Sequence, residues 1–481
     1  MIASFAVCML GFAAIGAASL RVRRTTSDDY LLAGRDVPPW LAALSAVATN
    51  NSGYMFIGQI GLTYAIGVQS LWLAVGWIVG DALVWWRVHR RIREISEEED
   101  ARSVPSLLGG RSRSRAIVVV TAVLVLVFLG TYAAAQLQAG AKALHAVLGW
   151  DQWIGVVIGA AIVLLYSYAG GLRASIWTDA AQSFVMIAAM GALLAWSIAR
   201  IGGFGALSDS LVAIEPSLVD PLASEAPWGF APWALGWIGG GLGVLGQPTI
   251  LARTMSLRKA SDVPRAGVIY FSWFIPFYVA TILLGLCARV LVPELADPEL
   301  AMPTLADRVL PELLVGTMLA GVFAATMSTA DSQILACSAA ITEDLMPRRE
   351  RPYFVNKLAT AAVASMALGI ALWADEGVFV LVLYAWAALA VTLGPLVVVR
   401  ALDRPLPPRV ALAMMGMGFA TMLAWRAAGL DAAMYEILPG MLAAALTYGV
   451  AALLGAVLKH EKVEHPVRAA RREAVALAEN R

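Results

Sequence analysis

The sequence LSAVATNNSGYMFIGQIG, residues 44–61, decides the fold of this chain. With its flanks this apolar stretch is long enough to cross a bilayer, yet polar and small residues interrupt its centre, namely Thr49, Asn50, Asn51, Ser52 and Gly53. Amide and hydroxyl groups at membrane depth cost free energy unless they are partnered, and such a run also weakens a helix. The pattern therefore predicts an opened backbone whose bare carbonyl oxygens hold a small cation and one end of a solute.

The composition places the rest of the chain in a membrane. Of 481 residues, 60% are hydrophobic and 14% are charged, and the mean hydropathy is +0.73. These values lie outside the range of soluble proteins and predict an all-α, multi-pass protein of the plasma membrane, surrounded by lipid. The formal net charge of +1, with no single basic face, indicates no nucleic-acid partner.

Apolar runs of sufficient length predict thirteen membrane spans. They cover residues 2–20, 40–64, 68–86, 116–141, 152–170, 174–199, 231–251, 266–291, 313–342, 356–373, 377–399, 409–425 and 433–458. In this arrangement the basic clusters at 21–24, 87–93, 111–115, 253–265, 348–357, 400–409 and 459–472 all fall on one side. Because basic residues collect in cytoplasmic loops, the N-terminus is expected outside and the C-terminus in the cytoplasm.

The seventh predicted span, APWALGWIGGGLGVLGQPTIL at residues 231–251, is also interrupted. Its glycines lower the cost of unwinding, and Pro248 removes a backbone donor. The two interruptions are five spans apart, which predicts inverted repeats over about 40–199 and 231–399, with ligands held by the discontinuous helices. Glycines can instead serve close helix packing, but two breaks at corresponding positions favour a transporter. Residues 1–24 then form a first helix, 25–402 the transporter core, 403–459 two further helices and 460–481 a cytoplasmic tail.

A partial cation site is predicted in the ninth span. Ala325, Ser328 and Thr329 are spaced to share one helix face. Two hydroxyls and a carbonyl suit a hard monovalent cation, and the missing ligands are expected from carbonyls near Ala48 and Asn51 in the second span. Hydrogen bonding of the two hydroxyls to the preceding helical turn is the alternative.

Acidic residues inside the spans are further candidates, because ionisable side chains at membrane depth are usually functional. Asp179 lies within the sixth span. Two roles stay open for it: ion release, or a structural role in which it accepts from Thr178 or pairs with Arg173. Asp81 lies closer to the expected cytoplasmic edge and is interpreted as a packing or interface group.

Several stretches carry a resemblance to a known family. They are DYLLAGRDVPPWLAALSA (29–46), SGYMFIGQIGLTYAIG (52–67), GGLRASIWTDAAQ (170–182), GQPTILAR (246–253) and MSTADSQILACSAAITEDL (327–345). The sequence resembles the sodium:solute symporter family, and within it the sodium/proline symporter branch. The resemblance implies about thirteen transmembrane helices, a LeuT-like five-plus-five inverted repeat with discontinuous helices two and seven, and sodium as the coupling ion.

The resemblance also implies individual roles. It assigns sodium to backbone oxygens of Ala48, Asn51 and Ala325 and to the hydroxyls of Ser328 and Thr329, and it associates Asp179 with sodium passage toward the cytoplasm. It places Ser52, Gly53, Tyr54, Gln247 and Pro248 near the solute.

Four substrate candidates depart from the pattern of the proline symporters. Those proteins have an aspartate at the position of Asn50, where sugar-transporting relatives also have asparagine. They have a tryptophan where this chain has Tyr54, and aromatic residues at the positions of Gly240 and Val244. The loss of two aromatic walls is expected to enlarge or reshape the solute pocket.

The expected function is sodium-coupled uptake of a small organic solute, with an amino acid such as proline as the best candidate. The alternatives are sodium- or proton-coupled uptake of another small carboxylate, a sugar or a vitamin, and a substrate sensor with a transporter fold. An enzyme is not expected, because the four histidines are not clustered and no catalytic constellation is apparent.

Overall fold

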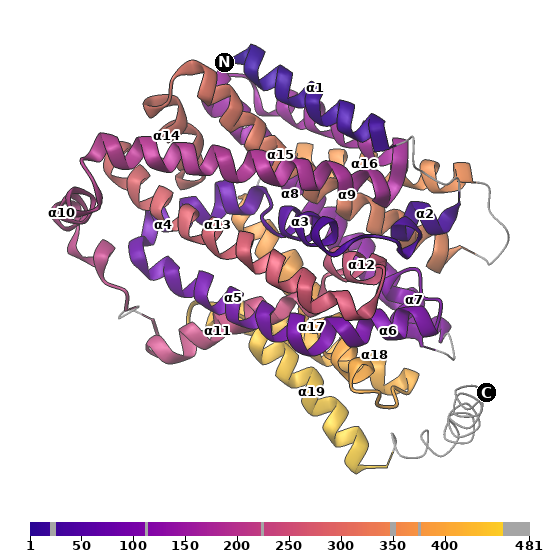
Figure 1. Cartoon of the computed structure of the whole chain (residues 1–481). Helices are drawn as coiled ribbons and strands as arrows, with labels where there is room; N and C mark the ends of the chain where they lie inside the picture. The colour runs from indigo at the N-terminus through magenta and orange to yellow at the C-terminus, as the bar shows by residue number, and fades with distance from the viewer. Residues whose placement is uncertain (20–25, 111–113, 223–225, 347–352, 374–376, 456–481) are drawn as a thin grey trace.

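The computed structural model describes residues 1–19, 26–110, 114–222, 226–346, 353–373 and 377–455. Within these ranges every regular element is a helix, which confirms the predicted all-α class (Figure 1). The expected tail at 460–481 and the basic clusters at 21–24 and 459–472 lie outside the described residues.

The α-helices follow the chain in the order of their labels. They are α1 (Ile2–Ser19), α2 (Ser27–Leu32), α3 (Pro39–Asn50), α4 (Ile60–Ile66), α5 (Leu71–Val84), α6 (Arg90–Glu98), α7 (Val104–Gly109), α8 (Arg115–Leu148), α9 (Gln152–Ile201), α10 (Phe204–Ile214), α11 (Phe230–Leu242), α12 (Pro248–Ser256), α13 (Val263–Leu291), α14 (Ala301–Val309), α15 (Glu312–Ala339), α16 (Tyr353–Trp373), α17 (Val378–Ala401), α18 (Pro408–Ala427) and α19 (Ile437–Leu453). Eight helical segments among the described residues are long and apolar enough to cross a membrane, and shorter apolar helices accompany them. Within the described residues each predicted span overlaps helical structure.

Both predicted interruptions are breaks in the structure. In the second span α3 ends at Asn50, and the chain passes through Asn51 and Ser52 before a wide helical turn at Tyr54–Gln59 leads into α4. In the seventh span α11 ends at Leu242, a tight turn covers Gly243–Gly246, and α12 begins at Pro248. Proline suits this first helical position, where no backbone donor is needed. The second and seventh predicted spans are therefore discontinuous helices.

The fifth and sixth predicted spans meet without a loop. They form the single element α9, whose backbone turns at Gly171 with φ of +59°. Residues with a side chain rarely adopt this conformation. A Cβ at this position would also lie 2.6 Å from Tyr30. Gly171 therefore permits both the turn and the close approach of α2.

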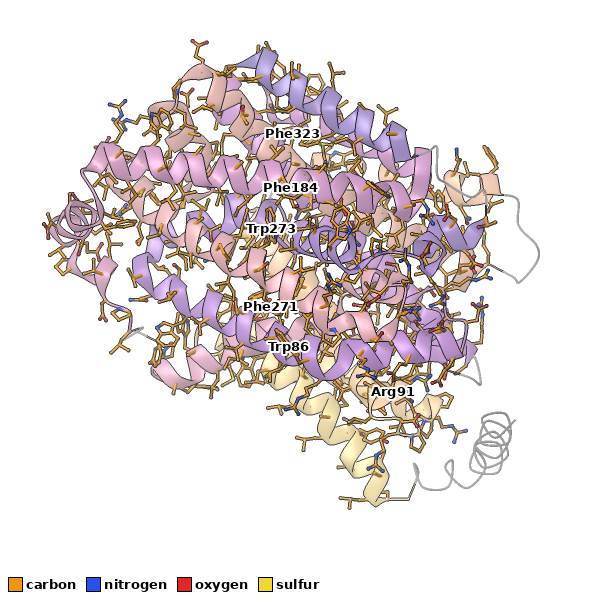
Figure 2. All side chains as sticks on the ribbon, in the orientation of Figure 1. Trp86, Arg91, Phe184, Phe271, Trp273 and Phe323 are labelled. Atoms are coloured by element: carbon orange, nitrogen blue, oxygen red, sulfur yellow. The ribbon has the colours of Figure 1, made fainter. Side chains whose placement is uncertain are left out.

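Most of the long helices run in roughly the same direction across the view, whereas the short α10 is seen end-on (Figure 1). α15 packs against α8 and α9, and nearly all of its residues from Gly316 onward are buried. On the outside, aromatic pairs join α13 to its neighbours (Figure 2). Phe184 meets Trp273 edge to face at 4.9 Å, and Trp86 stacks on Phe271 at 5.1 Å. Trp86 stays 49% exposed, as a lipid-facing side chain would be.

Candidate cation and solute sites

The broken second span lies directly against α15 at its centre. The Ser328 hydroxyl is 3.1 Å from the carbonyl oxygens of both Ala48 and Ala325. The Thr329 hydroxyl is 2.9 Å from the Thr49 carbonyl and 3.0 Å from that of Ala325. All these residues are buried. Two hydroxyls and three carbonyls thus converge from two helices. Both hydroxyls donate to the Ala325 carbonyl of the preceding turn, as the alternative predicts, and the Ala48 and Thr49 carbonyls bring in the neutral oxygens of a candidate cation site.

The structure changes one expected member of this cluster. Thr49, which the sequence analysis did not include, contributes a carbonyl at hydrogen-bonding distance from Thr329. Asn51 is buried beside the break, and its amide N–H donates to the Val47 carbonyl. The side-chain oxygen of Asn51 has no partner among the described residues. The exact point at which α3 opens decides which carbonyls are available, and the residue pattern alone does not define that point.

Asp179 has a different partner from the one considered. Arg173 pairs with Asp29 at 2.5 Å, and the Thr178 hydroxyl donates to its own helix backbone. Asp179 instead forms a fully buried ion pair with Arg253 at 2.9 Å. The expectation that Arg253 belongs to a basic cytoplasmic loop is therefore wrong, because α12 carries its side chain back into the bundle.

A polar network joins this ion pair to the oxygen atoms of the candidate cation site. Arg253 donates to Ser45 at 2.8 Å and also to the Ser332 hydroxyl. Ser45 donates to Asp179 at 2.6 Å. Ser332 in turn donates to the Ser328 carbonyl at 2.6 Å and lies 3.3 Å from the Thr49 hydroxyl. The network therefore begins one helical turn from Ser328.

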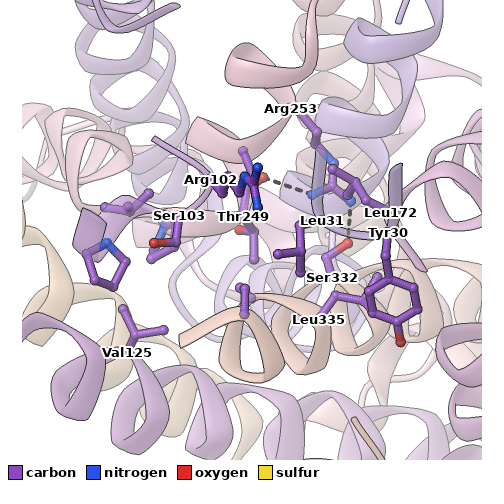
Figure 3. A pocket seen from close by; sticks show the side chains of 16 residues that line it. Tyr30, Leu31, Arg102, Ser103, Val125, Leu172, Thr249, Arg253, Ser332 and Leu335 are labelled. Carbon is purple, nitrogen blue, oxygen red and sulfur yellow. Dashed lines mark hydrogen bonds between the residues drawn. The ribbon is translucent and has the colours of Figure 1, made fainter. Parts of the chain in front are cut away.

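A cavity of about 40 Å³ opens beside the same network (Figure 3). Arg253, Ser332 and Thr249 line its inner wall, and Arg102 and Ser103 line the part nearer α7. Pro248, a predicted solute residue, also lines this cavity. Ser332, one helical turn from Ser328, thus lines the same small cavity as the residues at the start of α7.

On the other side of the break the side chains are aromatic. Tyr54 stacks on Phe379 at 5.6 Å and on Trp77 at 6.2 Å between ring centroids. Trp77 also meets Trp386 at 5.4 Å and stacks on Tyr435 at 6.5 Å. Three different helical segments and the loop before α19 thus contribute one aromatic cluster around the predicted solute position.

The missing aromatic side chain at Gly240 does not leave an open space. A Cβ on Gly240 would lie 2.9 Å from the Trp77 ring and 3.4 Å from Tyr435. Trp386 donates its indole N–H to the Gly240 carbonyl at 2.9 Å. Trp77 therefore occupies the volume beside Gly240, which agrees with a reshaped rather than an enlarged pocket at this position. The sequence analysis missed Trp77 because it lies in a different span.

The remaining solute candidates lie around this cluster. The Gly53 amide donates to Gln136 at 2.8 Å, and Ser52 is 3.4 Å from the Tyr132 hydroxyl. Gln247 makes long contacts to the carbonyls of Gly243 and Trp386, at 3.4 and 3.3 Å. Val244 is fully buried in the turn before it.

Asn50 lies among buried polar groups of two other helices. Its side-chain amide donates to the Tyr270 hydroxyl and lies 3.5 Å from Asp81. Tyr270 donates to the same Asp81 oxygen at 2.6 Å. Asp81 is completely buried. Asp81, interpreted from the sequence as a packing or interface group, thus packs against the break of the second span.

Comparison with known proteins agrees with this architecture. The model of the sodium:solute symporter family matches residues 30–403. Sodium/proline symporters of Salmonella typhimurium and Escherichia coli are each 31% identical, and each match covers 95% of this chain and 93% of the relative. The high-affinity proline transporter PutP of Bacillus subtilis is 29% identical over 88% of this chain and 92% of its own.

Solved structures show the same fold at low sequence identity. A sodium-coupled sialic acid symporter superposes with a TM-score of 0.82 at 16% identity, covering 94% of this chain and 97% of the other. A nucleobase-cation-symport-1 family transporter has a TM-score of 0.56 at 14% identity, covering 88% and 94%.

Proposed function

The chain belongs to the sodium:solute symporter family, and we propose that the solute it carries into the cell with sodium is proline. Sodium is the coupling ion. The observation that carries the proposal of sodium coupling is the contact of the Ala48 and Thr49 carbonyls with Ser328 and Thr329 of α15. This contact links an opened helix to a continuous one, so a cation between them favours one arrangement of the two.

The solute pocket is assigned to the aromatic cluster next to the break. Tyr54, Trp77 and Trp386 offer flat apolar faces that suit a compact ring such as that of proline. The side-chain amide of Gln247, whose contacts to Gly243 and Trp386 are long, lies beside this cluster for the polar ends of the solute. The names of the curated relatives support proline as the solute.

The direction of transport follows from the expected orientation. We assign the end with α6 and α7 to the cytoplasm, because the basic loops are predicted there. The cavity beside Arg253 and Ser332 then opens toward the cytoplasm. Sodium leaving Ser328 passes Ser332 and Asp179 into this cavity.

Coupling requires that sodium and solute prefer one facing state over the other, since a ligand that binds both equally shifts nothing. Sodium at the break stabilises the geometry in which the adjacent backbone groups contact the solute. The sodium gradient and the membrane potential, about 2.3 kcal/mol per charge per 100 mV, then drive accumulation.

Uptake into proteoliposomes tests this function. Labelled proline and a panel of small carboxylates, sugars and vitamins are offered with and without an inward sodium gradient. The Ser328→Ala/Thr329→Ala double variant is compared with Thr317→Ala, which removes a hydroxyl bonded only to its own turn of the same helix. We expect sodium-driven proline uptake that is lost in the double variant and retained in Thr317→Ala.

Other results would change specific parts of the proposal. Sodium-driven uptake of another panel member would replace proline as the solute. Uptake indifferent to sodium and to the double variant would refute the coupling site. Solute binding without any net uptake would favour a sensor with a transporter fold.

A further inference from the structure

Asp81 is a buried carboxylate whose negative charge is not balanced by a basic side chain in the described part of the chain. It has no exposed surface. One of its oxygens accepts hydrogen bonds from Tyr270 and Asn50, and the other has no partner among the described residues. An uncompensated carboxylate at membrane depth is costly, so such a group indicates a bound cation or a functional proton.

The groups around Asp81 come from three helices. Trp77 lies one turn before Asp81 on α5, and Trp85 lies one turn after it, just beyond the end of α5. Tyr270 comes from α13 and Asn50 from α3. The nearest basic side chain on the same helical face is His89, eight residues further, which is about 12 Å along the axis. Trp85 stacks on His89 at 4.5 Å and therefore separates it from Asp81.

We propose that Asp81 is the charged ligand of a second sodium ion, held between α5, α13 and the break of the second span. This inference rests on the proposed sodium coupling. Its further ligands are the Tyr270 hydroxyl and the Asn50 side-chain oxygen. The Asn50 amide can present its oxygen instead of its nitrogen by rotating, since both ends of an amide can face a polar partner. These are hard oxygen donors, as sodium requires.

The proposal explains the neutral residue at position 50. The proline symporters that this chain resembles have an aspartate there. In this chain a carboxylate reaches the same place from α5, because Asp81 contacts the Asn50 side chain directly. The negative charge is therefore retained near the break, but a different helix supplies it.

The second site adjoins the first one through the backbone. Ala48 and Thr49 offer their carbonyls to the Ser328 and Thr329 side, and the next residue, Asn50, points to Asp81. The same opened turn of α3 serves both ions. Sodium at either site orders that turn, so binding at the two sites is expected to be positively cooperative.

Equilibrium binding of radioactive sodium to the purified full-length protein at pH 8 tests the proposal without any knowledge of the solute. We expect two sodium ions per wild-type molecule and one in Asp81→Asn. The Ser328→Ala/Thr329→Ala variant should also bind one. Asp209→Asn, which neutralises an exposed carboxylate on α10, is the matched control and should bind two.

The Asn50→Asp/Asp81→Asn exchange returns the carboxylate to position 50 and should restore two ions. A role of Asp81 in packing alone would not be rescued by this exchange. Tyr270→Phe retains the Asp81 carboxylate and replaces Asp81→Asn in this test if Asp81→Asn does not fold. It should lower the sodium affinity of one site at least fivefold and leave the other unchanged.

Each outcome separates the two proposals. One sodium ion in the wild type, or two in Asp81→Asn, would overturn the second site and leave the proposed function intact. Loss of an ion in Asp81→Asn but not in the Ser328→Ala/Thr329→Ala variant would support the second site and refute the first. An exchange variant that binds one ion would also overturn the inference.

Discussion

Arg253 illustrates how much a single side chain depends on its surroundings. It is 1% exposed and Asp179 is 0% exposed, so neither charge has access to bulk solvent. Removing one partner of a buried ion pair leaves an uncompensated charge, whereas replacing both partners is often tolerated. The pair therefore holds α12 against α9 and places Ser45 and Ser332 between them.

We expect Arg253→Met to destabilise the protein by about 3–5 kcal/mol, because Asp179 stays buried without its cation. The Asp179→Asn/Arg253→Met variant should recover most of this loss. Thermal unfolding in detergent measures both changes. Arg258→Met is the control, because its pair with Asp36 is exposed and such pairs contribute about 0–1 kcal/mol. Equal losses in the single and double variants would contradict the interpretation.

Gly240 and Trp77 form a second pair at the residue scale. Gly240→Ala brings a Cβ to 2.9 Å from the Trp77 ring, so we expect proline uptake to fall at least tenfold. Trp77→Leu should relieve the contact, and the Gly240→Ala/Trp77→Leu variant should exceed Gly240→Ala in uptake. Initial rates in proteoliposomes measure the coupling of the two positions. Strictly additive effects would show that the two side chains act independently.

Among the elements, α9 depends on its turn at Gly171. Gly171→Ala combines an unfavourable positive φ with a contact to Tyr30, and we expect a loss of about 1–3 kcal/mol. Gly191→Ala in the same helix meets no atom within 4 Å and should be neutral or slightly stabilising, since alanine favours helices. Unfolding temperatures of the two variants provide the comparison. A larger loss in Gly191→Ala would refute the role of the turn.

The segment before α14 closes the end opposite to α7. Glu299 pairs with Lys142 of α8 at 2.6 Å and accepts from the first amides of α17, at Val378 and Phe379. Glu299 thus connects the segment before α14 with α8 and α17. One of its α17 contacts is Phe379, which stacks on Tyr54. This contact caps α17 at its N-terminus, where a carboxylate is favourable.

Glu299→Gln should weaken this closure and speed hydrogen exchange of the amides at 378–383. Asp297→Asn is the control, because Asp297 also pairs with Lys142, at 2.9 Å, but accepts its backbone hydrogen bond from the Glu299 amide and not from α17. Exchange measured by mass spectrometry on the reconstituted protein compares the two. Faster exchange in Asp297→Asn than in Glu299→Gln would contradict the capping role.

At the scale of the whole molecule, the proposed orientation determines the direction of transport. Ser217 lies on an exposed loop at the α10 end, and Lys259 lies on an exposed loop at the opposite end. In a Cys8→Ser background, a membrane-impermeant maleimide should label Ser217→Cys in intact cells. It should label Lys259→Cys only after permeabilisation. The reverse pattern would invert the topology and the direction assigned to the cavity.

The sequence by itself determined the class, the spans and both broken helices of this transporter. Apolar runs, glycines and polar interruptions are local properties. Each membrane-spanning segment must satisfy its backbone hydrogen bonds within the bilayer, so these properties act span by span. The pairing of Ser328 and Thr329 with the second span was also accessible, because their spacing puts them on one face and the break supplies free carbonyls.

The tertiary structure alone decided which distant side chains complete the site. Three of these side chains come from other elements, namely Trp77, Asp81 and Arg253. Thr49 lies in the second span itself, but the sequence pattern does not reveal that its carbonyl faces α15. Asp81 and Arg253 lie near predicted span ends, and only the packing of α5 and α12 brings them inward. Contacts between helices depend on their relative rotation and depth, which the whole bundle sets, and a one-dimensional pattern carries no record of these two quantities.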